Sequence, residues 1–270
     1  MGKLNDKEKL NLVEDFKLND DLTILSLKYG IHRSSVRGLL KRRGIKLKNF
    51  SESRRIYTIN ENFFDVFNEN SLYVLGILYA DGYHNEKRKS IRLSLKESDD
   101  ELLLKINNLI GSNRPLGVDT SRGKGYAQKY LDINNVMISK KLSHLGCVQN
   151  KTFKIVFPDF LPQENLKHFI RGYFDGDGGL TTYEIVDKKT KKPTQKYKLT
   201  FRGTKDFCEK LKFFLNIELG VGGSISKEKI PSLEFSGKFE ILKILDYLYT
   251  DSTIFMERKY QKYKTIKNGK

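Results

Sequence analysis

The sequence predicts an α+β protein, built from two tandem helix–strand–strand–helix–strand–strand–helix repeats behind a small all-α domain. Three observations predict this architecture. An approximate internal repeat begins at residue 71, and each copy opens with an apolar helix that ends in Asp-Gly. Each opening helix is followed by a strand in which apolar and polar residues alternate. Residues 5–43, ahead of the repeats, show the spacing of three short helices.

The N-terminal helices resemble a DNA-binding module. Gly30 separates the second helix from the third, and two helices joined by a Gly-containing turn are typical of a helix-turn-helix. The outward positions of the third helix carry groups that can bond to the major groove. These positions are Arg33, Ser34, Arg37 and Lys41. A plain helical bundle with a solvated basic face is the alternative interpretation.

We expect four segments along the chain: a helix-turn-helix domain at 1–46, a basic linker at 47–70, a first repeat at 71–162 and a second repeat at 163–270. The alternating strands lie at 91–96 and 197–202, and the helices that follow them at 99–110 and 205–219. The second repeat carries an insertion after its first helix, and its lysines are expected to contact phosphate. They are Lys188, Lys189, Lys191 and Lys192.

Composition narrows the partner. The net charge of +17 favours a polyanion, with nucleic acid as the first candidate. The sequence has neither an apolar run of about 18 residues nor the apolar core of a signal peptide, which argues against a membrane location. Cys147 and Cys208 are far apart in sequence, which argues against structural zinc and for a reducing compartment. We therefore expect a cytoplasmic protein.

The two opening helices align on their final acids. Small residues four positions apart lie on one face of each helix and allow two backbones to approach closely. The matching residues are Gly76, Ala80 and Asp81 in the first helix and Gly172, Gly176 and Asp177 in the second. If these faces pack together, Asp81 and Asp177 meet beside the carbonyl oxygens of both helix ends, an oxygen-rich site suited to Mg²⁺. A single Asp-Gly after an apolar helix is usually only a helix end, but two matched copies favour a site.

Residues 74–82 (VLGILYADG) and 170–178 (IRGYFDGDG) resemble the two LAGLIDADG motifs of a single-chain homing endonuclease. The resemblance extends over residues 71–263. It implies that the motif helices form the interface between pseudo-symmetric halves and that Asp81 and Asp177 bind the catalytic metals, beside Ala80 and Gly176. Tyr79 stands where the motif name has Asp, a position that is not a metal ligand in the family.

The resemblance also implies the reaction. Members of the family cleave both DNA strands across the minor groove with Mg²⁺, in a site that Mn²⁺ or Ca²⁺ also occupies, and leave 3′ overhangs. A basic residue near the end of each repeat assists the attacking water. Lys151 and Lys259 are the best matches, and Lys154 and Arg258 are close competitors.

Alternation along the strands indicates the DNA-facing side of the sheets. The polar positions are Arg92, Ser94 and Lys96 in the first repeat and Lys198, Thr200 and Arg202 in the second. We expect Lys96 and Arg202 to occupy matching positions near the metals. The expected partner is double-stranded DNA with a long, asymmetric site, bound by a monomer. The alternatives are a catalytically silent DNA-binding regulator and an RNA maturase of the same fold.

Overall fold

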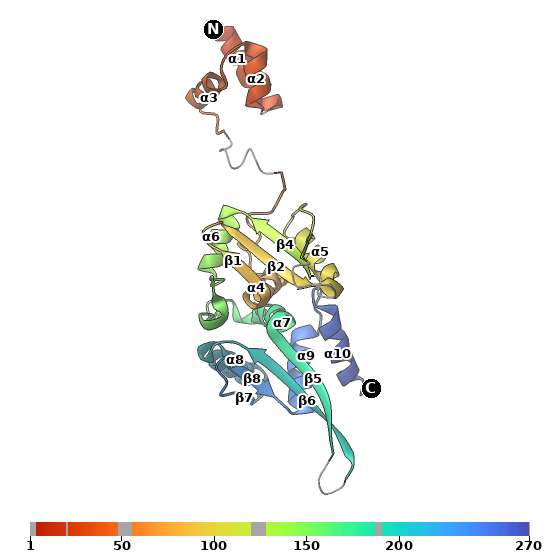
Figure 1. Ribbon diagram of the computed structural model, residues 1–270. Coiled ribbons are helices and arrows are strands. Elements are labelled where there is room, and N and C mark those ends of the chain that lie inside the picture. The colour runs from red at the N-terminus through yellow and green to blue at the C-terminus, as the bar shows by residue number, and fades with distance from the viewer. Residues whose placement is uncertain (1–3, 20, 48–55, 120–127, 187–190, 270) are drawn as a thin grey trace. The chain divides into compact units, whose positions relative to one another are not determined.

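The computed structural model describes residues 4–19, 21–47, 56–119, 128–186 and 191–269. The chain divides into two compact units, residues 1–56 and 57–270, each labelled by its elements in Figure 1. Residues 57–70, expected as the second half of a linker, belong to the second unit. Phe64 of this segment is buried in that unit's core. Two lysines of the predicted insertion, Lys188 and Lys189, lie outside the described residues.

Unit 1 contains the three helices expected from the sequence: α1 (Asp6–Leu18), α2 (Leu22–Tyr29) and α3 (Arg33–Arg42). The Asp21 side chain begins α2 by accepting a hydrogen bond from the Thr23 amide at 2.6 Å. Gly30, with φ of +61°, ends α2 in the left-handed conformation that glycine adopts freely. A separate apolar core forms from Leu12, Leu25, Val36, Leu39 and Leu40.

Unit 2 confirms the predicted order of elements in both repeats. The first repeat comprises α4 (Glu69–Asp81), β1 (Gly82–Asn85), β2 (Ser90–Lys96), α5 (Asp100–Leu109), β3 (Gly117–Asp119), β4 (Gln128–Asn134) and α6 (Val136–His144). The second comprises α7 (Leu166–Asp177), β5 (Gly178–Val186), β6 (Pro193–Arg202), α8 (Lys205–Leu219), β7 (Ser224–Ile225), β8 (Ser232–Phe235) and α9 (Lys238–Tyr249). Within the described ranges, no helix has the length and apolar content needed to cross a membrane.

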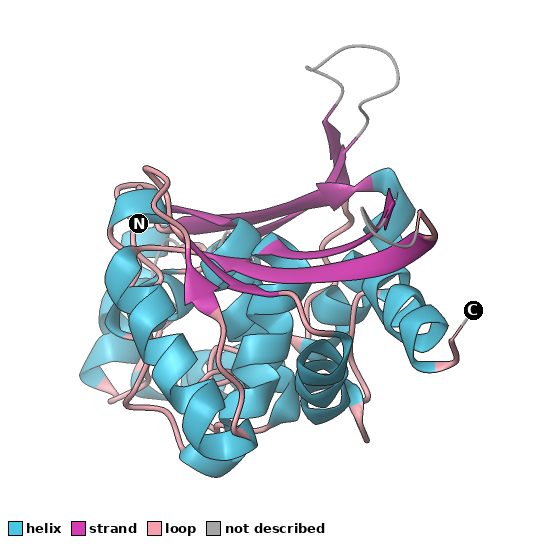
Figure 2. Ribbon diagram, turned by 90° about the horizontal axis from the view of Figure 1, so that it is seen from below, coloured by secondary structure: helices cyan, strands magenta, loops and turns pink. Residues whose placement is uncertain are grey.

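Each repeat forms one four-stranded antiparallel sheet, in the orders β1-β2-β4-β3 and β5-β6-β8-β7. Figure 2 shows the strands gathered on one side of unit 2 and the helices on the other. The predicted alternation is confirmed: Ile91, Leu93 and Leu95 are buried in β2, and Leu199 and Phe201 in β6. The polar residues between them therefore point to the face without helices.

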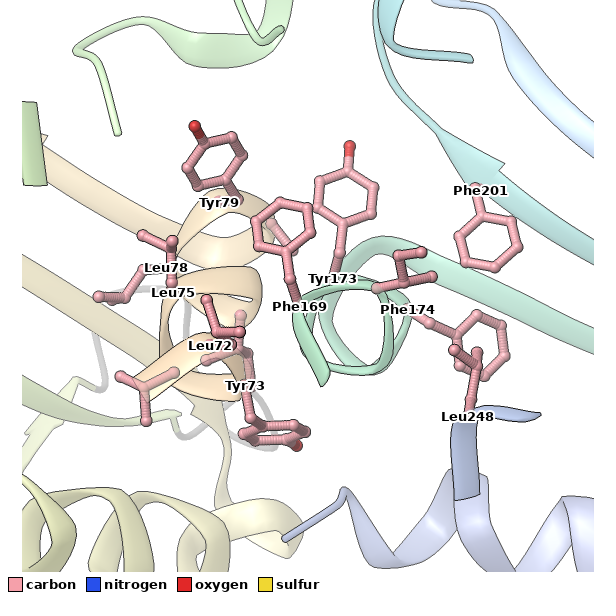
Figure 3. Packing of buried hydrophobic residues seen from close by; sticks show 14 of the residues in the cluster. Leu72, Tyr73, Leu75, Leu78, Tyr79, Phe169, Tyr173, Phe174, Phe201 and Leu248 are labelled. Carbon is pink, nitrogen blue, oxygen red and sulfur yellow. The ribbon is translucent and has the colours of Figure 1, made fainter. Parts of the chain in front are cut away.

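The two motif helices, α4 and α7, lie side by side (Figure 3), and their glycines allow a close approach. A Cβ built on Gly76 would lie 2.1 Å from the carbonyl oxygen of Phe169, and one on Gly172 would lie 2.1 Å from that of Tyr73. Both distances are far inside van der Waals contact, so any larger side chain would push the backbones apart. The close approach expected from the small residues is confirmed.

Strand register corrects one expectation. Gly82 pairs with Leu93, whereas its equivalent Gly178 pairs with Phe201, so Leu93 matches Phe201. Arg202 therefore matches Ser94, and the expectation that it matches Lys96 is wrong by two residues. Lys96 instead precedes the 3₁₀ turn at Glu97–Asp99, as Thr204 precedes α8. Alternation has a period of two, so it cannot detect a shift of two residues.

One helix was not predicted. It is α10 (Glu257–Lys267), which follows the second repeat and buries Lys259, Tyr263 and Ile266 along one side. Spacings of four and three residues are those of a helix face. The first buried position is a lysine, so the apolar periodicity that would have revealed this helix is incomplete in the sequence.

Candidate active site at the crossing of the motif helices

The two acids lie at adjacent helix ends. Helix α4 ends at Asp81 and α7 at Asp177, and each is followed directly by the first strand of its sheet. A Cβ built on Gly176 would lie 2.3 Å from the Cβ of Ala80 and 3.0 Å from Oδ2 of Asp81. The Asp81 carboxylate thus rests on the last turn of α7, one residue from Asp177.

Ionisation of both acids is disfavoured where they lie. Loss of solvent around the carboxylate and the negative charge of Asp81 raise the pKa of Asp177 to about 6. Burial also raises the pKa of Asp81, against the opposing positive charges of Lys151 and Lys259. A divalent cation between the carboxylates would remove this repulsion.

Two lysines contact the same place on the two motif helices. The Lys151 ammonium donates to the carbonyl of Leu78 at 3.1 Å. The Lys259 ammonium donates to the carbonyl of Phe174, and to those of Gly176 at 3.3 Å and Gly178 at 2.5 Å. Leu78 and Phe174 are equivalent, since each lies three residues before its motif acid. The lysines are therefore related by the same pseudo-symmetry as the acids.

The competing basic residues have other surroundings. Lys154 is exposed at the end of the turn Lys151–Phe153. Nε of Arg258 donates to both oxygens of Asp99, at 2.9 and 3.2 Å, which ties α10 to the first repeat. In contrast, burial lowers the pKa of Lys151 and lowers that of Lys259 to about 8. This geometry favours Lys151 and Lys259 as the basic residues of the site.

A pocket of about 210 Å³ opens beside Asp177. Lys151, Asp177 and Arg202 all line it. Arg202 is exposed and its nearest acid, Glu228, is 3.9 Å away, so its guanidinium is held only loosely by the protein. Lys96 is also exposed, at the end of β2. The register places Arg202, in the second repeat, level with Ser94 of the first.

The two basic residues expected further along the sheets already have acidic partners. Nε and Nη2 of Arg92 donate to Asp132 at 2.7 and 2.9 Å, and the guanidinium stacks 3.8 Å from the ring centre of Tyr130. Lys198 forms an ion pair with Glu234 at 2.8 Å. The sequence did not predict a role for Asp132 or Glu234. Each follows the leucine that pairs with Leu93 or Phe201, so the two acids are equivalent.

The remaining predicted DNA-binding residues are accessible or half-buried. Ser94 and Thr200 are half-buried on the sheet faces, and Lys191 and Lys192 are exposed just before β6, the strand that ends in Arg202. In unit 1, the outward residues of α3 are exposed: Arg33, Ser34, Arg37 and Lys41. The Ser34 hydroxyl lies 2.7 Å from Nδ1 of His32, the residue that caps this helix.

The donor set suits a hard cation. Asp81 and Asp177 supply carboxylates, and the helix ends at Ala80 and Gly176 supply carbonyl oxygens, which are the ligands that Mg²⁺ and Ca²⁺ prefer. Within the described part of the chain, no three His, Cys, Asp or Glu side chains gather as a metal-binding group. Water or a substrate phosphate would complete the coordination of a cation held there.

Comparisons with known proteins identify the fold. No family model matches the chain, and no curated protein matches it in sequence. The I-LtrWI LAGLIDADG homing endonuclease bound to target DNA superposes with a TM-score of 0.53 at 12% identity, over 75% of this chain and 91% of that one. LAGLIDADG meganuclease I-AabMI bound to uncleaved DNA gives 0.52 at 12% identity, over 73% and 88%. A double lysine-to-alanine mutant of I-SmaMI gives 0.50 at 15%, over 73% and 89%. Unit 2 thus has the fold that the motif resemblance implied.

Proposed function

We propose that this chain, which has the LAGLIDADG homing-endonuclease fold, is a site-specific DNA endonuclease that hydrolyses both strands with a divalent metal. The observation that carries the proposal is the pair of acids, Asp81 and Asp177, at adjoining helix ends, each accompanied by an equivalently placed lysine. The structural neighbours, two of them bound to DNA, support the same substrate. Mg²⁺ is the proposed metal, with Mn²⁺ or Ca²⁺ able to occupy the site.

Each group at the helix ends has a separate task. Asp81 and Asp177 would hold the cation, which when bound supplies activation of a water and stabilisation of the leaving oxygen. Lys151 lines the pocket beside Asp177 and has one backbone partner, so two of its N–H groups can orient water or phosphate. Arg202, only loosely paired, would contact the phosphate being cut.

The free faces of the two sheets would lie on the duplex and place its minor groove over the acids. Cleavage across that groove leaves 3′ overhangs in the family, and we propose the same product here. Because Arg92, Lys198 and the insertion lysines differ between the repeats, the target should be long and asymmetric. We propose that the chain acts as a monomer, since it contains both motifs.

Unit 1 would add a second DNA contact. Its exposed residues Arg33, Arg37 and Lys41 project from α3 at the spacing of one helix face, as in helix-turn-helix proteins that enter the major groove. This contact would strengthen binding through phosphate interactions without touching the metal site.

Cleavage by an acid-to-amide variant tests the proposal. Duplexes that the protein retains from a randomised library in Ca²⁺ are transferred to Mg²⁺ and followed on denaturing gels. We expect Asp177→Asn or Asp81→Asn to slow cutting on the order of 10²–10³-fold or more, as for loss of one electrostatic contact to a transition state. Binding in Ca²⁺ should stay within a few-fold of wild type, since phosphate contacts elsewhere hold the DNA.

Asp159→Asn is the matched control, because Asp159 is an exposed acid that pairs with Lys210 at 2.8 Å on α8. It should cut at the wild-type rate. Wild-type cutting by the Asp81 or Asp177 variant, or cutting that persists in EDTA, would contradict the proposed site.

A further inference from the structure

The motif position two residues before each metal-binding acid carries different chemistry in the two repeats. It is Tyr79 in α4 and Asp175 in α7, and both side chains are buried. Residues two apart on a helix point to nearly opposite sides. Each side chain therefore points away from its neighbouring acid. Tyr79 lines the pocket beside Asp177, but its hydroxyl, like the Asp175 carboxylate, has its hydrogen-bond partners elsewhere in the fold.

In the first repeat, Tyr79 holds the chain that leads to Lys151. Its hydroxyl donates to the carbonyl of Leu145. The next residue, Gly146, has φ of +91°, and a Cβ there would lie 2.0 Å from the tyrosine hydroxyl oxygen. The chain thus passes directly against the phenol, six residues before Lys151 reaches the Leu78 carbonyl.

In the second repeat, Asp175 holds the chain that leads to Lys259. Its Oδ2 accepts from the amide of Met256 at 2.7 Å, and Met256 is the N-cap residue of α10. The hydroxyls of Tyr249 and Tyr73 donate to the same carboxylate at 2.6 and 2.8 Å, which fixes its orientation. Lys259 lies three residues beyond Met256, within the first turn of α10.

We propose that Tyr79 and Asp175 are positioning residues that fix Lys151 and Lys259 on the ends of the motif helices. The inference rests on the proposed function, because it assigns the lysines a part in cleavage. A hydroxyl that donates to a carbonyl and a carboxylate that accepts from an amide perform the same task with opposite polarity. Each contact fixes the backbone from which a long, flexible lysine reaches a carbonyl of the same motif helix.

The pairing explains why this motif position tolerates either residue. The side chain at this position must reach the segment that leads to the lysine of its repeat. Its partner there is the Leu145 carbonyl in the first repeat and the Met256 amide in the second. Loosening either contact should displace one ammonium group and leave the other in place. Displacements on the order of 1 Å in a reacting group can cost about 10²-fold in rate.

Strand-resolved cleavage separates this role from a general packing role. A supercoiled plasmid with one selected site is cut by wild type, Tyr79→Phe and Asp175→Asn, and each strand is followed from its own label. We expect Tyr79→Phe to slow one strand and Asp175→Asn the opposite strand, each on the order of 10-fold, as for groups that orient metal-site residues. Nicked circles should accumulate with both variants.

A double-mutant comparison identifies the path of the effect. In a Lys151→Met background, Tyr79→Phe should slow cutting no further, because the lysine through which it acts is gone. Tyr263→Phe is the matched control: this buried hydroxyl donates to Asp246 at 2.6 Å, downstream of Lys259 on α10. It should leave the ratio of the two strand rates unchanged.

Three results would overturn the inference: wild-type rates on both strands, equal slowing of both strands, or additive effects with Lys151→Met. Thermal unfolding shows whether each variant is folded. If Asp175→Asn does not fold, the result for Tyr79→Phe decides the test. If the wild-type protein cuts neither strand, both the proposed function and this inference are wrong. If the wild-type protein cuts normally and the variants cut at the same rates, only the inference is wrong.

Discussion

The two repeats agree closely at the helix ends and differ at the surfaces that would meet DNA. Asp81 and Asp177 follow matched glycine crossings, and Lys151 and Lys259 reach equivalent carbonyls. By contrast, β5 has nine residues where β1 has four, and Arg92 has no basic counterpart in the second sheet. Two chemically identical phosphodiesters require matched geometry, whereas two different half-sites require different surfaces.

The agreement is not complete even at the centre. The Lys259 ammonium is buried and donates to three carbonyls, which uses every N–H it has. Lys151 donates to one carbonyl and lines the pocket beside Asp177. The first repeat thus presents the more available ammonium, and Arg202 of the second repeat lines the same pocket. The two repeats would therefore contribute unequally to cutting.

The largest expected effect is a loss of stability when the crossing of α4 and α7, to which both repeats contribute, is disrupted. Gly172→Ala would place a Cβ 2.1 Å from the Tyr73 carbonyl oxygen, so the helices must separate. We expect a loss of unfolding free energy of about 3 kcal/mol or more, the upper part of the range for overpacked cores. Denaturant titration measures this loss.

Gly38→Ala is the matched control for this substitution. Gly38 is also inside a helix, and its Cβ would have nothing within 4 Å. It should be neutral or stabilise unit 1 by up to about 1 kcal/mol, the helix preference of alanine over glycine. Equal effects at the two glycines would show that the crossing does not require Gly172.

A smaller effect, on DNA affinity, tests how the two sheet faces that would meet DNA differ. Arg92→Ala should weaken binding to the selected site by about 1–3 kcal/mol if the arginine contacts a base. The substitution also leaves Asp132 without its bidentate partner on the face that would meet phosphate. Fluorescence anisotropy on selected and random duplexes measures both affinities.

Lys198 provides the comparison for Arg92, because it pairs with Glu234, the acid of the second sheet that is equivalent to Asp132. Lys198→Ala removes a single ion pair with Glu234 and should cost less on the selected site than Arg92→Ala. If Arg92→Ala weakens binding to random and selected DNA equally, the arginine contacts phosphate only.

The smallest effect is a pH dependence of stability in the metal-free protein. The pKa of Asp177 is raised to about 6 in the folded state, so folding favours its protonated form. Its ionisation therefore costs stability as the pH rises from about 4 through 6. Although neighbouring groups remove part of the solvent around its carboxylate, the Asp177 side chain keeps contact with water, so solvent screens its charge and the effect should be small.

Thermal midpoints in EDTA measure this dependence. Asp177→Asn should be more stable than wild type at pH 7.5 and match it near pH 4, and Mg²⁺ should stabilise wild type more than the variant. If the difference in thermal midpoint between the variant and wild type does not change with pH, folding does not disfavour the ionised form of Asp177.

Local patterns predicted most of the fold, and long-range pairings account for what they missed. Period-two alternation placed Arg92 and Arg202 on the correct face, but it could not fix their register, which depends on how β2 and β6 pair with the strands that follow the motif helices. Asp132 and Glu234 became visible only when their strands paired with β2 and β6. The role of Asp175 became visible only when the fold brought the Met256 amide to its carboxylate.

The central claim is that unit 2 alone carries a cleavage site assembled from two unequal repeats. The most direct measurement maps both cut ends, nucleotide by nucleotide, for the full chain and for residues 57–270 on the same duplex in Mg²⁺. The account predicts one cut per strand, 3′ overhangs and identical positions for both proteins, with weaker and less salt-dependent binding by the shorter one. Cuts that shift when unit 1 is removed, or that fall on one strand only, would contradict it.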